Sequence, residues 1–127
     1  MTTTELNQLT EHIIACAFKV LNTLGAGFLE KVNENALAHE LRKSGHRVKQ
    51  QEHLTVTYDG AVVGEYEPDL LVDEIVIVEI KATREHHEVF EACCLNYLAV
   101  TKLPVCLLLN FGKPRLGIKR LVGQTYD

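Results

Sequence analysis

The feature that most constrains the fold is an apolar run that ends in two opposite charges. Residues 75–81 read Ile-Val-Ile-Val-Glu-Ile-Lys. A short run this rich in β-branched residues predicts a central strand with both faces covered. Glu79 and Lys81 are two positions apart, so their side chains leave a strand on the same face. Because buried charge is costly unless it is paired, the end of this strand also predicts a polar site.

The sequence around this strand predicts an α/β fold. Apolar residues recur at helical spacing in three segments, and turn signals such as Asp59-Gly60 separate segments typical of strands. The expected order is helix, helix, three-strand antiparallel meander, helix, strand, with a further edge strand. Because a helix connects the third and fourth strands, the fourth strand is expected to lie parallel to a neighbour, in a mixed four- to five-stranded sheet flanked by helices. The predicted helices are 5–24, 29–44 and 85–101, and the predicted strands are 48–58, 61–72, 75–81, 105–110 and 116–122.

Composition limits the class of protein. The chain has 127 residues, 46% hydrophobic and 24% charged, which is typical of one folded domain over 1–127. The net charge of −4 argues against a protein that coats nucleic acid, but a nuclease remains open because its metal ions supply positive charge. The four cysteines lack zinc-site spacing, and no membrane span or secretory signal is recognisable. We therefore expect a cytoplasmic protein with reduced thiols.

A second carboxylate, Asp69, lies on the preceding predicted strand, directly after Pro68. A three-residue turn at 73–75 would pair Val72 with Val76 and place Asp69 opposite Glu79. A two-residue turn would shift the register by one residue and move Asp69 to the other face of the sheet. A site built on both carboxylates therefore requires the three-residue turn. The alternative is a surface hairpin that ends in an ordinary Glu–Lys pair.

Two carboxylates about 4 Å apart repel by roughly 4 kcal/mol at an effective dielectric constant near 20. Lys81 would offset part of this repulsion, and a divalent cation would offset it better. Mg²⁺ favours a few carboxylates together with water molecules. Glu30, in the first turn of the second predicted helix, is a further candidate ligand if that helix packs on the sheet. The alternative is that Glu30 only complements the helix dipole.

Three parts of the chain, in their order and spacing, resemble the small bacterial GxxExxY proteins. They are residues 24–30 with 35–37, the Pro68-Asp69 pair with 79–82, and residues 95–98 with 109–112. That family is assigned to the PD-(D/E)XK nuclease-like superfamily. The resemblance implies a restriction-endonuclease-like core of helix, three strands, helix and strand.

The resemblance also implies roles for individual residues. Asp69 and Glu79 would bind Mg²⁺ or Mn²⁺, Glu30 would be an auxiliary ligand, and Lys81 would position or activate the attacking water. Two residues depart from the family pattern, since Asn33 replaces its tyrosine and Cys93 replaces a helix glutamine. Both lie near the predicted site, so they bear on substrate contacts and on activity.

Basic residues near the strand ends are candidates for phosphate contacts. Lys113 and Arg115 are predicted, with Asn33, to bind substrate, and solvated surface charge is the alternative for the two cations. We expect a metal-dependent phosphodiesterase that acts on DNA or RNA. The competing hypotheses are a non-catalytic module that binds nucleic acid or protein, and an unrelated enzyme acting on small molecules. The small size favours a homodimer, because one domain offers little surface to grip a duplex.

Overall fold

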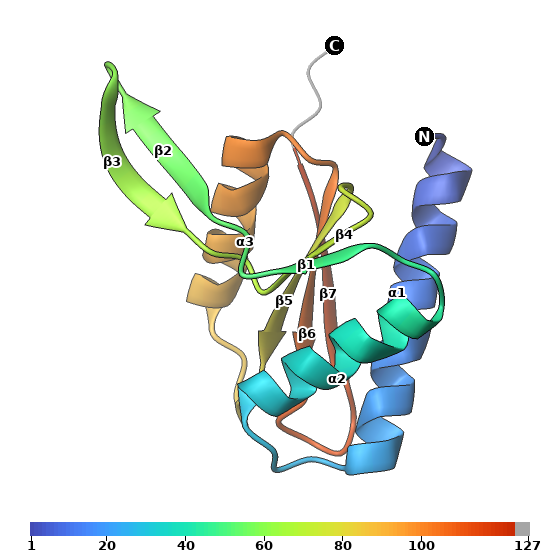
Figure 1. The fold of residues 1–127 in the computed structure, drawn as a ribbon. Coiled ribbons are helices and arrows are strands. Elements are labelled where there is room, and N and C mark those ends of the chain that lie inside the picture. The colour runs from blue at the N-terminus through green and yellow to red at the C-terminus, as the bar shows by residue number, and fades with distance from the viewer. Residues whose placement is uncertain (124–127) are drawn as a thin grey trace.

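A computed structural model of the chain describes residues 1–123 and shows a central sheet with helices on both faces (Figure 1). The elements of the described part follow one another as helix, helix, five strands, helix and two strands. They are α1 (Thr3–Leu24), α2 (Glu30–Lys43), β1 (Val48–Gln50), β2 (Leu54–Tyr58), β3 (Ala61–Tyr66), β4 (Leu70–Val72), β5 (Val76–Lys81), α3 (Glu88–Thr101), β6 (Val105–Asn110) and β7 (Gly117–Val122).

The central sheet has five strands in the order β1-β4-β5-β6-β7. The β5–β6 pair is parallel, and the other neighbouring pairs are antiparallel. The α3 crossover between β5 and β6 explains the parallel pair, because a strand that returns through a helix runs in the same direction as the first. The mixed sheet and its predicted edge strand are thereby confirmed.

The predicted strands 48–58 and 61–72 are each broken in two. Their outer pieces, β1 and β4, pair in the central sheet, and their inner pieces, β2 and β3, form a separate two-stranded sheet. The three-strand antiparallel unit is therefore β1-β4-β5, with a hairpin inserted between β1 and β4. The breaks have local causes. Gln51 has a positive φ of 56°, and Pro68 cannot donate a ladder hydrogen bond.

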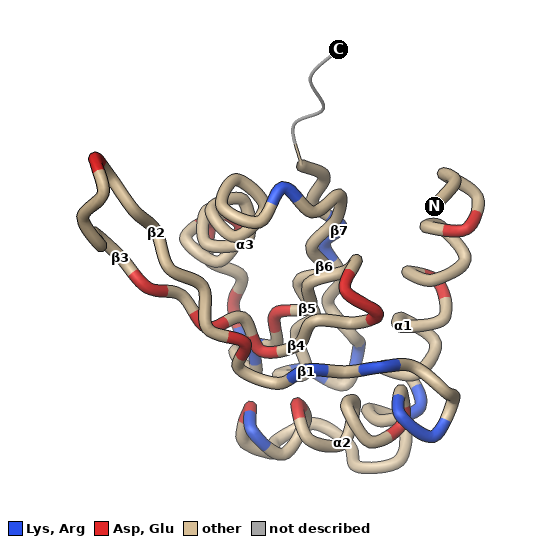
Figure 2. The backbone as a smooth tube through the Cα atoms, turned by 45° about the horizontal axis from the view of Figure 1, so that its top comes forward, with Lys and Arg blue, Asp and Glu red and all other residues tan. Residues whose placement is uncertain are grey.

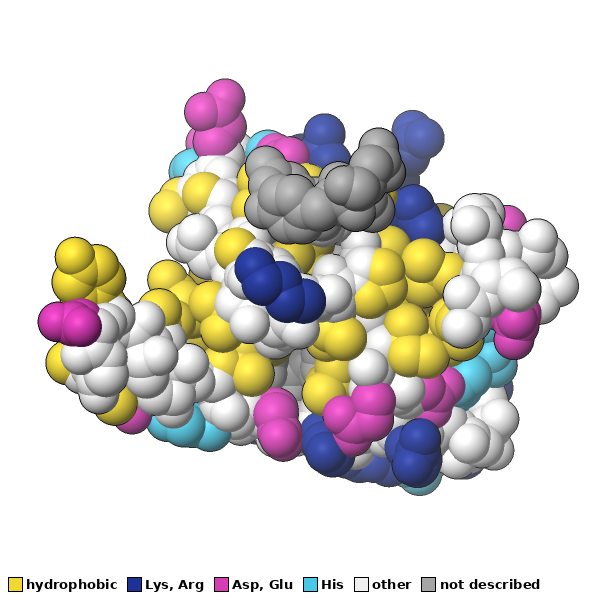
Figure 3. All heavy atoms as spheres, turned by 90° about the horizontal axis from the view of Figure 1, so that it is seen from above, with side chains coloured by type: hydrophobic (Ala, Val, Ile, Leu, Met, Phe, Trp, Pro, Cys, Tyr) yellow, Lys and Arg dark blue, Asp and Glu magenta, His cyan; other side chains and the backbone are white. Residues whose placement is uncertain are grey.

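The inserted β2–β3 hairpin projects from the body of the protein (Figure 1). Its far end exposes large apolar side chains, including Tyr58, Val62 and Val63. Figure 3 shows hydrophobic side chains on the outer surface at the left. Its near end packs against the body, where Tyr66 meets Tyr97 of α3 edge to face at 5.5 Å between ring centroids. The hairpin is thus anchored at one end only.

The two faces of the sheet carry separate cores. On β5, Val76, Val78 and Ile80 pack with α1 and α2, whereas Ile77 packs with α3. This alternation confirms that both faces of the predicted central strand are covered. It also directs Glu79 and Lys81 to the α3 face, because they share the parity of Ile77.

The helix ends differ from the sequence prediction by a few residues. α1 begins at Thr3 because Thr2 caps it, with reciprocal hydrogen bonds between Thr2 and Glu5 at 3.1 and 3.2 Å. α3 begins at Glu88 rather than at residue 85. Among the described residues, no helix combines the length and apolarity needed to cross a membrane.

Candidate active site

The register of β4 and β5 places Asp69 opposite Glu79. Leu70 pairs with Val78 and Val72 pairs with Val76, so the next pair beyond the end of β4 is Asp69 with Glu79. The connecting turn spans three residues, and two of them, Asp73 and Glu74, have positive φ. The predicted three-residue turn is confirmed, and the two-residue alternative is wrong.

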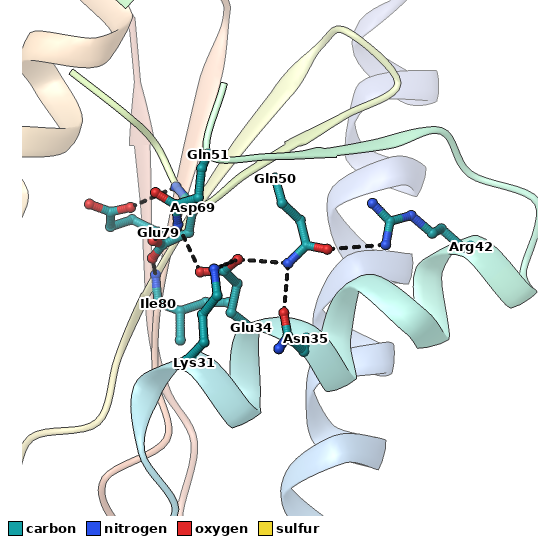
Figure 4. Close-up of polar contacts among 9 residues, drawn as sticks. All are labelled: Lys31, Glu34, Asn35, Arg42, Gln50, Gln51, Asp69, Glu79 and Ile80. Atoms are coloured by element: carbon teal, nitrogen blue, oxygen red, sulfur yellow. Dashed lines mark hydrogen bonds and ion pairs between the residues drawn. The ribbon is translucent and has the colours of Figure 1, made fainter. Parts of the chain in front are cut away.

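Backbone N–H groups hold both carboxylates, Asp69 for Glu79 and Ile80 for Asp69. The Asp69 N–H donates to Glu79 Oε1 at 3.1 Å, and the Ile80 N–H donates to Asp69 Oδ2 at 2.8 Å (Figure 4). Because β4 begins only at Leu70, no β4 residue pairs with Ile80 of β5. The Ile80 N–H is therefore available to the Asp69 side chain. Both carboxylates are thereby fixed at the edge of the sheet. Figure 2 shows acidic positions gathered where β1, β4 and β5 meet.

Glu79 is buried, and its pKa is perturbed. It is 6% exposed, and the Tyr97 hydroxyl of α3 donates to its Oε2 at 2.8 Å. Burial and the neighbouring charge of Asp69 raise the pKa of Glu79 to about 7, although the Tyr97 hydrogen bond opposes the shift. The ionised pair is therefore strained at neutral pH. A divalent cation between the two carboxylates would relieve that strain.

Asp69 is also linked to α2 through an amide. Gln51 Nε2 donates to Asp69 Oδ1 at 3.1 Å and to Glu34 Oε1 at 2.9 Å (Figure 4). The other carboxylate oxygen of Glu34 accepts from Gln50 at 2.7 Å and from Lys31 at 2.9 Å. Glu34 is only 3% exposed, so a third acidic group is buried next to the pair.

The sequence prediction missed Glu34 and Gln51. A signal for Glu34 was present, because it precedes Leu37 and Leu41 by three and seven residues and so lies on the apolar stripe of its helix. A carboxylate on such a stripe must be paired. Gln51 gave no comparable signal, because its role depends on the break that separates β1 from β2.

Lys81 shares the face of Glu79 but lies apart from the carboxylates. Its Nζ sits 4.7 Å from the ring centroid of Phe90 on α3, a cation–π contact. Within residues 1–123, Lys81 forms no ion pair. The amine is therefore held over Phe90 and remains available to a ligand.

Comparison with known proteins bears on this arrangement. The sequence profile described as the PD-(D/E)XK nuclease superfamily matches residues 7–121, which is most of the chain. The chain belongs to the PD-(D/E)XK nuclease superfamily. The letters of this name can be read in the sequence as Pro68-Asp69 and Glu79-Ile80-Lys81.

Two solved structures share the fold of this PD-(D/E)XK protein. An alkaline exonuclease (LHK-Exo) from Laribacter hongkongensis superposes with a TM-score of 0.54 and 15% identity, over 74% of this chain and 56% of that one. SSO0001 superposes with a TM-score of 0.56 and 13% identity, over 76% and 50%. The chain thus spans about half the length of these structures. No curated protein sequence matches it. The restriction-endonuclease-like fold is confirmed.

The remaining predicted site residues of the PD-(D/E)XK chain lie further from the pair. Glu30 is exposed at the start of α2, and its Oε1 accepts from the Ala82 N–H at 3.4 Å. Asn33 is 1% exposed, with Nδ2 donating to Leu29 O at 3.4 Å and Oδ1 unpartnered among the described residues. The burial of Asn33 therefore does not favour a direct contact with substrate. Lys113 and Arg115 are exposed in the β6–β7 loop.

The chemistry of the pair fits a hard divalent cation. Within residues 1–123, no three His, Cys, Asp or Glu side chains converge as a ready-made metal cluster. Mg²⁺ does not need one, since one or two carboxylates with water molecules hold it in many phosphoryl-transfer sites. Asp69 and Glu79 supply that number, and Glu34 lies one amide away. Burial raises the pKa of the nearby Cys93 thiol, which disfavours a thiolate ligand or nucleophile there.

Proposed function

We propose that this chain is a Mg²⁺- or Mn²⁺-dependent nuclease that hydrolyses phosphodiester bonds of DNA or RNA. The observation that carries the proposal is the Asp69–Glu79 pair, in which a buried carboxylate with a pKa of about 7 faces a second one beside Lys81. Two neighbouring carboxylates disfavour each other's ionisation, and groups with strongly perturbed pKa values cluster at functional sites. Membership of the PD-(D/E)XK superfamily supports this reading.

Asp69 and Glu79 are the residues that would hold the ion. Tyr97 orients Glu79 through its hydroxyl, and the Ile80 N–H and Gln51 amide orient Asp69. When bound, the divalent ion would supply Lewis-acid activation of a water and offset the charge on the phosphate. Because these supports come from α3, from β5 and from the segment between β1 and β2, the pair is preorganised before substrate arrives.

Lys81 would act on the reacting group itself. Its amine is a donor of three hydrogen bonds held over Phe90, on the face that carries Glu79. We assign it to orienting the attacking water and to stabilising charge on the phosphate in the transition state. Glu30 remains a predicted auxiliary ligand, and its contact with Ala82 keeps it near the carboxyl end of β5.

A cleavage assay tests the proposal. Purified protein is incubated with labelled single- and double-stranded DNA and RNA, with Mg²⁺, Mn²⁺ or EDTA. Asp69→Asn and Lys81→Gln are each expected to lower cleavage by about 10²-fold or more, because each removes a group that acts in the transition state. Glu11→Gln, on the exposed side of α1, is the control for loss of one charge. Cleavage that survives in either site variant would show contamination and contradict the proposal.

The second candidate is a non-catalytic module that keeps the fold and binds nucleic acid or protein. Two observations favour it: the Asp69 carboxylate is already satisfied by internal donors, and Lys81 rests on Phe90 rather than on the acidic pair. Isothermal titration with Mg²⁺ and Mn²⁺ separates the two candidates. Absence of uptake at millimolar ion in the wild type would favour the module, whereas uptake lost in Asp69→Asn would favour the nuclease.

The finer assignments rest on the sequence alone, with the family type drawn from the resemblance and the homodimer from the small size. The GxxExxY type, the homodimer and a cytoplasmic location remain predictions. The substrate panel of the cleavage assay decides between DNA and RNA. Sedimentation of the purified chain across a concentration series decides whether it forms a dimer.

A further inference from the structure

A second polar site lies beside the acidic pair, in a cavity of about 270 Å³ at the carboxyl end of β6. Its wall is formed by Leu108 and Asn110 of β6 and by the start of β7. Four cationic residues surround it, namely Arg84, Lys113, Arg115 and Lys119. No acidic residue lines the cavity within residues 1–123.

These four cations lack internal anionic partners. In the part of the chain that the structure describes, none of them forms an ion pair. In a protein with a net charge of −4, a concave surface lined by four such groups concentrates positive potential locally. Figure 2 shows basic positions along β7.

The cavity opens on the face of the sheet that carries the candidate active site. Glu79 is level with Leu108 of β6, and Leu108 is level with Lys119 of β7. Neighbours in register across a sheet point to the same side, so Lys119 shares the face of Glu79. With about 4.8 Å between strands, the backbones of these two residues lie about 10 Å apart.

The floor of the cavity is held rigidly. Asn110 Oδ1 accepts from the N–H groups of Thr83 at 3.1 Å and Gly112 at 2.9 Å, and its Nδ2 donates to Thr83 Oγ1 at 3.1 Å. These bonds join the segments that carry Arg84 and Lys113. Two loops that are distant in sequence therefore carry their cations to the same hollow.

We propose that this cavity binds phosphate groups of the nucleic-acid strand that is cut at the Asp69–Glu79 pair. A separation of about 10 Å corresponds to roughly three nucleotides at a rise of 3.4 Å per nucleotide. The ligand is either an internal phosphodiester or a terminal phosphate, since both present the same charged oxygens. The site rests on the proposed function for the identity of its ligand, and it gives that function a means to position the strand.

The test measures binding without catalysis. A fluorescein-labelled oligothymidylate is titrated with protein in EDTA over a series of salt concentrations, and anisotropy gives the slope of log K against log salt. The Arg115→Gln/Lys119→Gln double variant is expected to reduce the magnitude of the slope by about 1.4, or 0.7 for each lost phosphate contact with a single strand.

A matched control comes from the next residue on the same strand. Arg120 is level with Leu107, faces α1 and donates to Asn7 Oδ1 at 3.0 Å, so it points away from the cavity. Arg120→Gln is expected to leave the slope unchanged although it removes the same charge. Lys119→Gln is the single-site variant to compare with this control. Equal changes of the slope in Arg120→Gln and Lys119→Gln would overturn the proposal. An unchanged slope in the double variant would also overturn it.

Oligonucleotides ending in a 5′-phosphate, a 3′-phosphate or hydroxyls identify the source of the phosphate. If the wild type prefers one phosphorylated end and the double variant does not, the ligand is a terminal phosphate. If the double variant loses the same affinity for all three oligonucleotides, the ligands are internal phosphodiesters. The cleavage assay separates this proposal from the previous one. If the double variant changes the slope but the wild type cleaves nothing, the phosphate site stands and the nuclease proposal is refuted. If the wild type cleaves but the double variant leaves the slope unchanged, the nuclease proposal stands and the phosphate site is refuted.

Discussion

The Asp69–Glu79 pair predicts that the protein becomes more stable when its site is destroyed. In Glu79→Gln, a neutral amide of nearly equal volume replaces the buried carboxylate. The amide still offers an oxygen to the Asp69 N–H and a hydrogen-bonding group to the Tyr97 hydroxyl. The substitution therefore removes the repulsion while retaining the local packing.

The magnitude follows from the pKa of Glu79, which is raised from 4.5 to about 7 in the folded protein by burial and by Asp69. Below about pH 4.5 both folded and unfolded states hold the proton, so there is no penalty. As the pH rises towards 7 the unfolded chain releases its proton first, and the folded state loses stability. At about 1.4 kcal/mol for each pKa unit, the loss is complete above pH 7 and amounts to roughly 3 kcal/mol.

Urea unfolding in EDTA at about pH 5 and pH 8 measures this loss. Glu79→Gln is expected to exceed the wild type in stability by roughly 1 kcal/mol at the lower pH and by roughly 3 kcal/mol at the higher pH. Glu11→Gln controls for the change in net charge. A stability difference between Glu79→Gln and the wild type that does not vary with pH would refute the reasoning. A wild type more stable than the variant at pH 8 would refute it more strongly.

Two further predictions concern the turns that hold the sheet. The carboxylate of Asp73 accepts from His46 at 2.7 Å, and its pKa is lowered because its hydrogen bonds outweigh the raising effect of burial. Asp73→Asn keeps the left-handed backbone but is expected to lose about 2 kcal/mol at neutral pH, by urea unfolding. That gap should close as the pH falls below 3.8, where the contribution of a depressed carboxyl is lost. Gly112→Ala would place a Cβ 2.2 Å from the Thr83 carbonyl oxygen and is expected to cost about 2 kcal/mol or more. Thermal unfolding checks this against Gly64→Ala, whose Cβ would lie at an ordinary 3.9 Å from its nearest neighbour; equal losses would contradict the steric argument.

Local pattern was enough to predict the central strand and the shared face of Glu79 and Lys81. The apolar run of β5 determined the central strand, and its two-residue spacing determined the shared face of Glu79 and Lys81. The sequence left two registers open for Asp69, and the Val72–Val76 pair shows the one that the site hypothesis requires. These features depend on residues close in sequence, where periodicity carries the information.

The remaining parts of the site depend on contacts between distant segments. Gln51 reaches Asp69 across 18 residues, and Tyr97 reaches Glu79 across a similar span. Tyr97 reads as a core residue in the sequence and is one, being 5% exposed, but its hydroxyl serves the site. Periodicity reports which face of a helix is buried, and it does not report what a polar tip meets there.

The breaks in the two long predicted strands explain where the site lies. If residues 61–72 had formed one strand, the backbone on both sides of Asp69 would have paired with β5. Because β4 begins only at Leu70, the Ile80 N–H is left for the Asp69 carboxylate, and Gln51 is free to bridge to Glu34. The late start of β4 at Leu70 therefore explains both why the predicted strand 61–72 is broken and why the Asp69 carboxylate can accept from Ile80. Local rules are expected to fail at functional positions, so the break before Leu70 is consistent with the site proposed at Asp69.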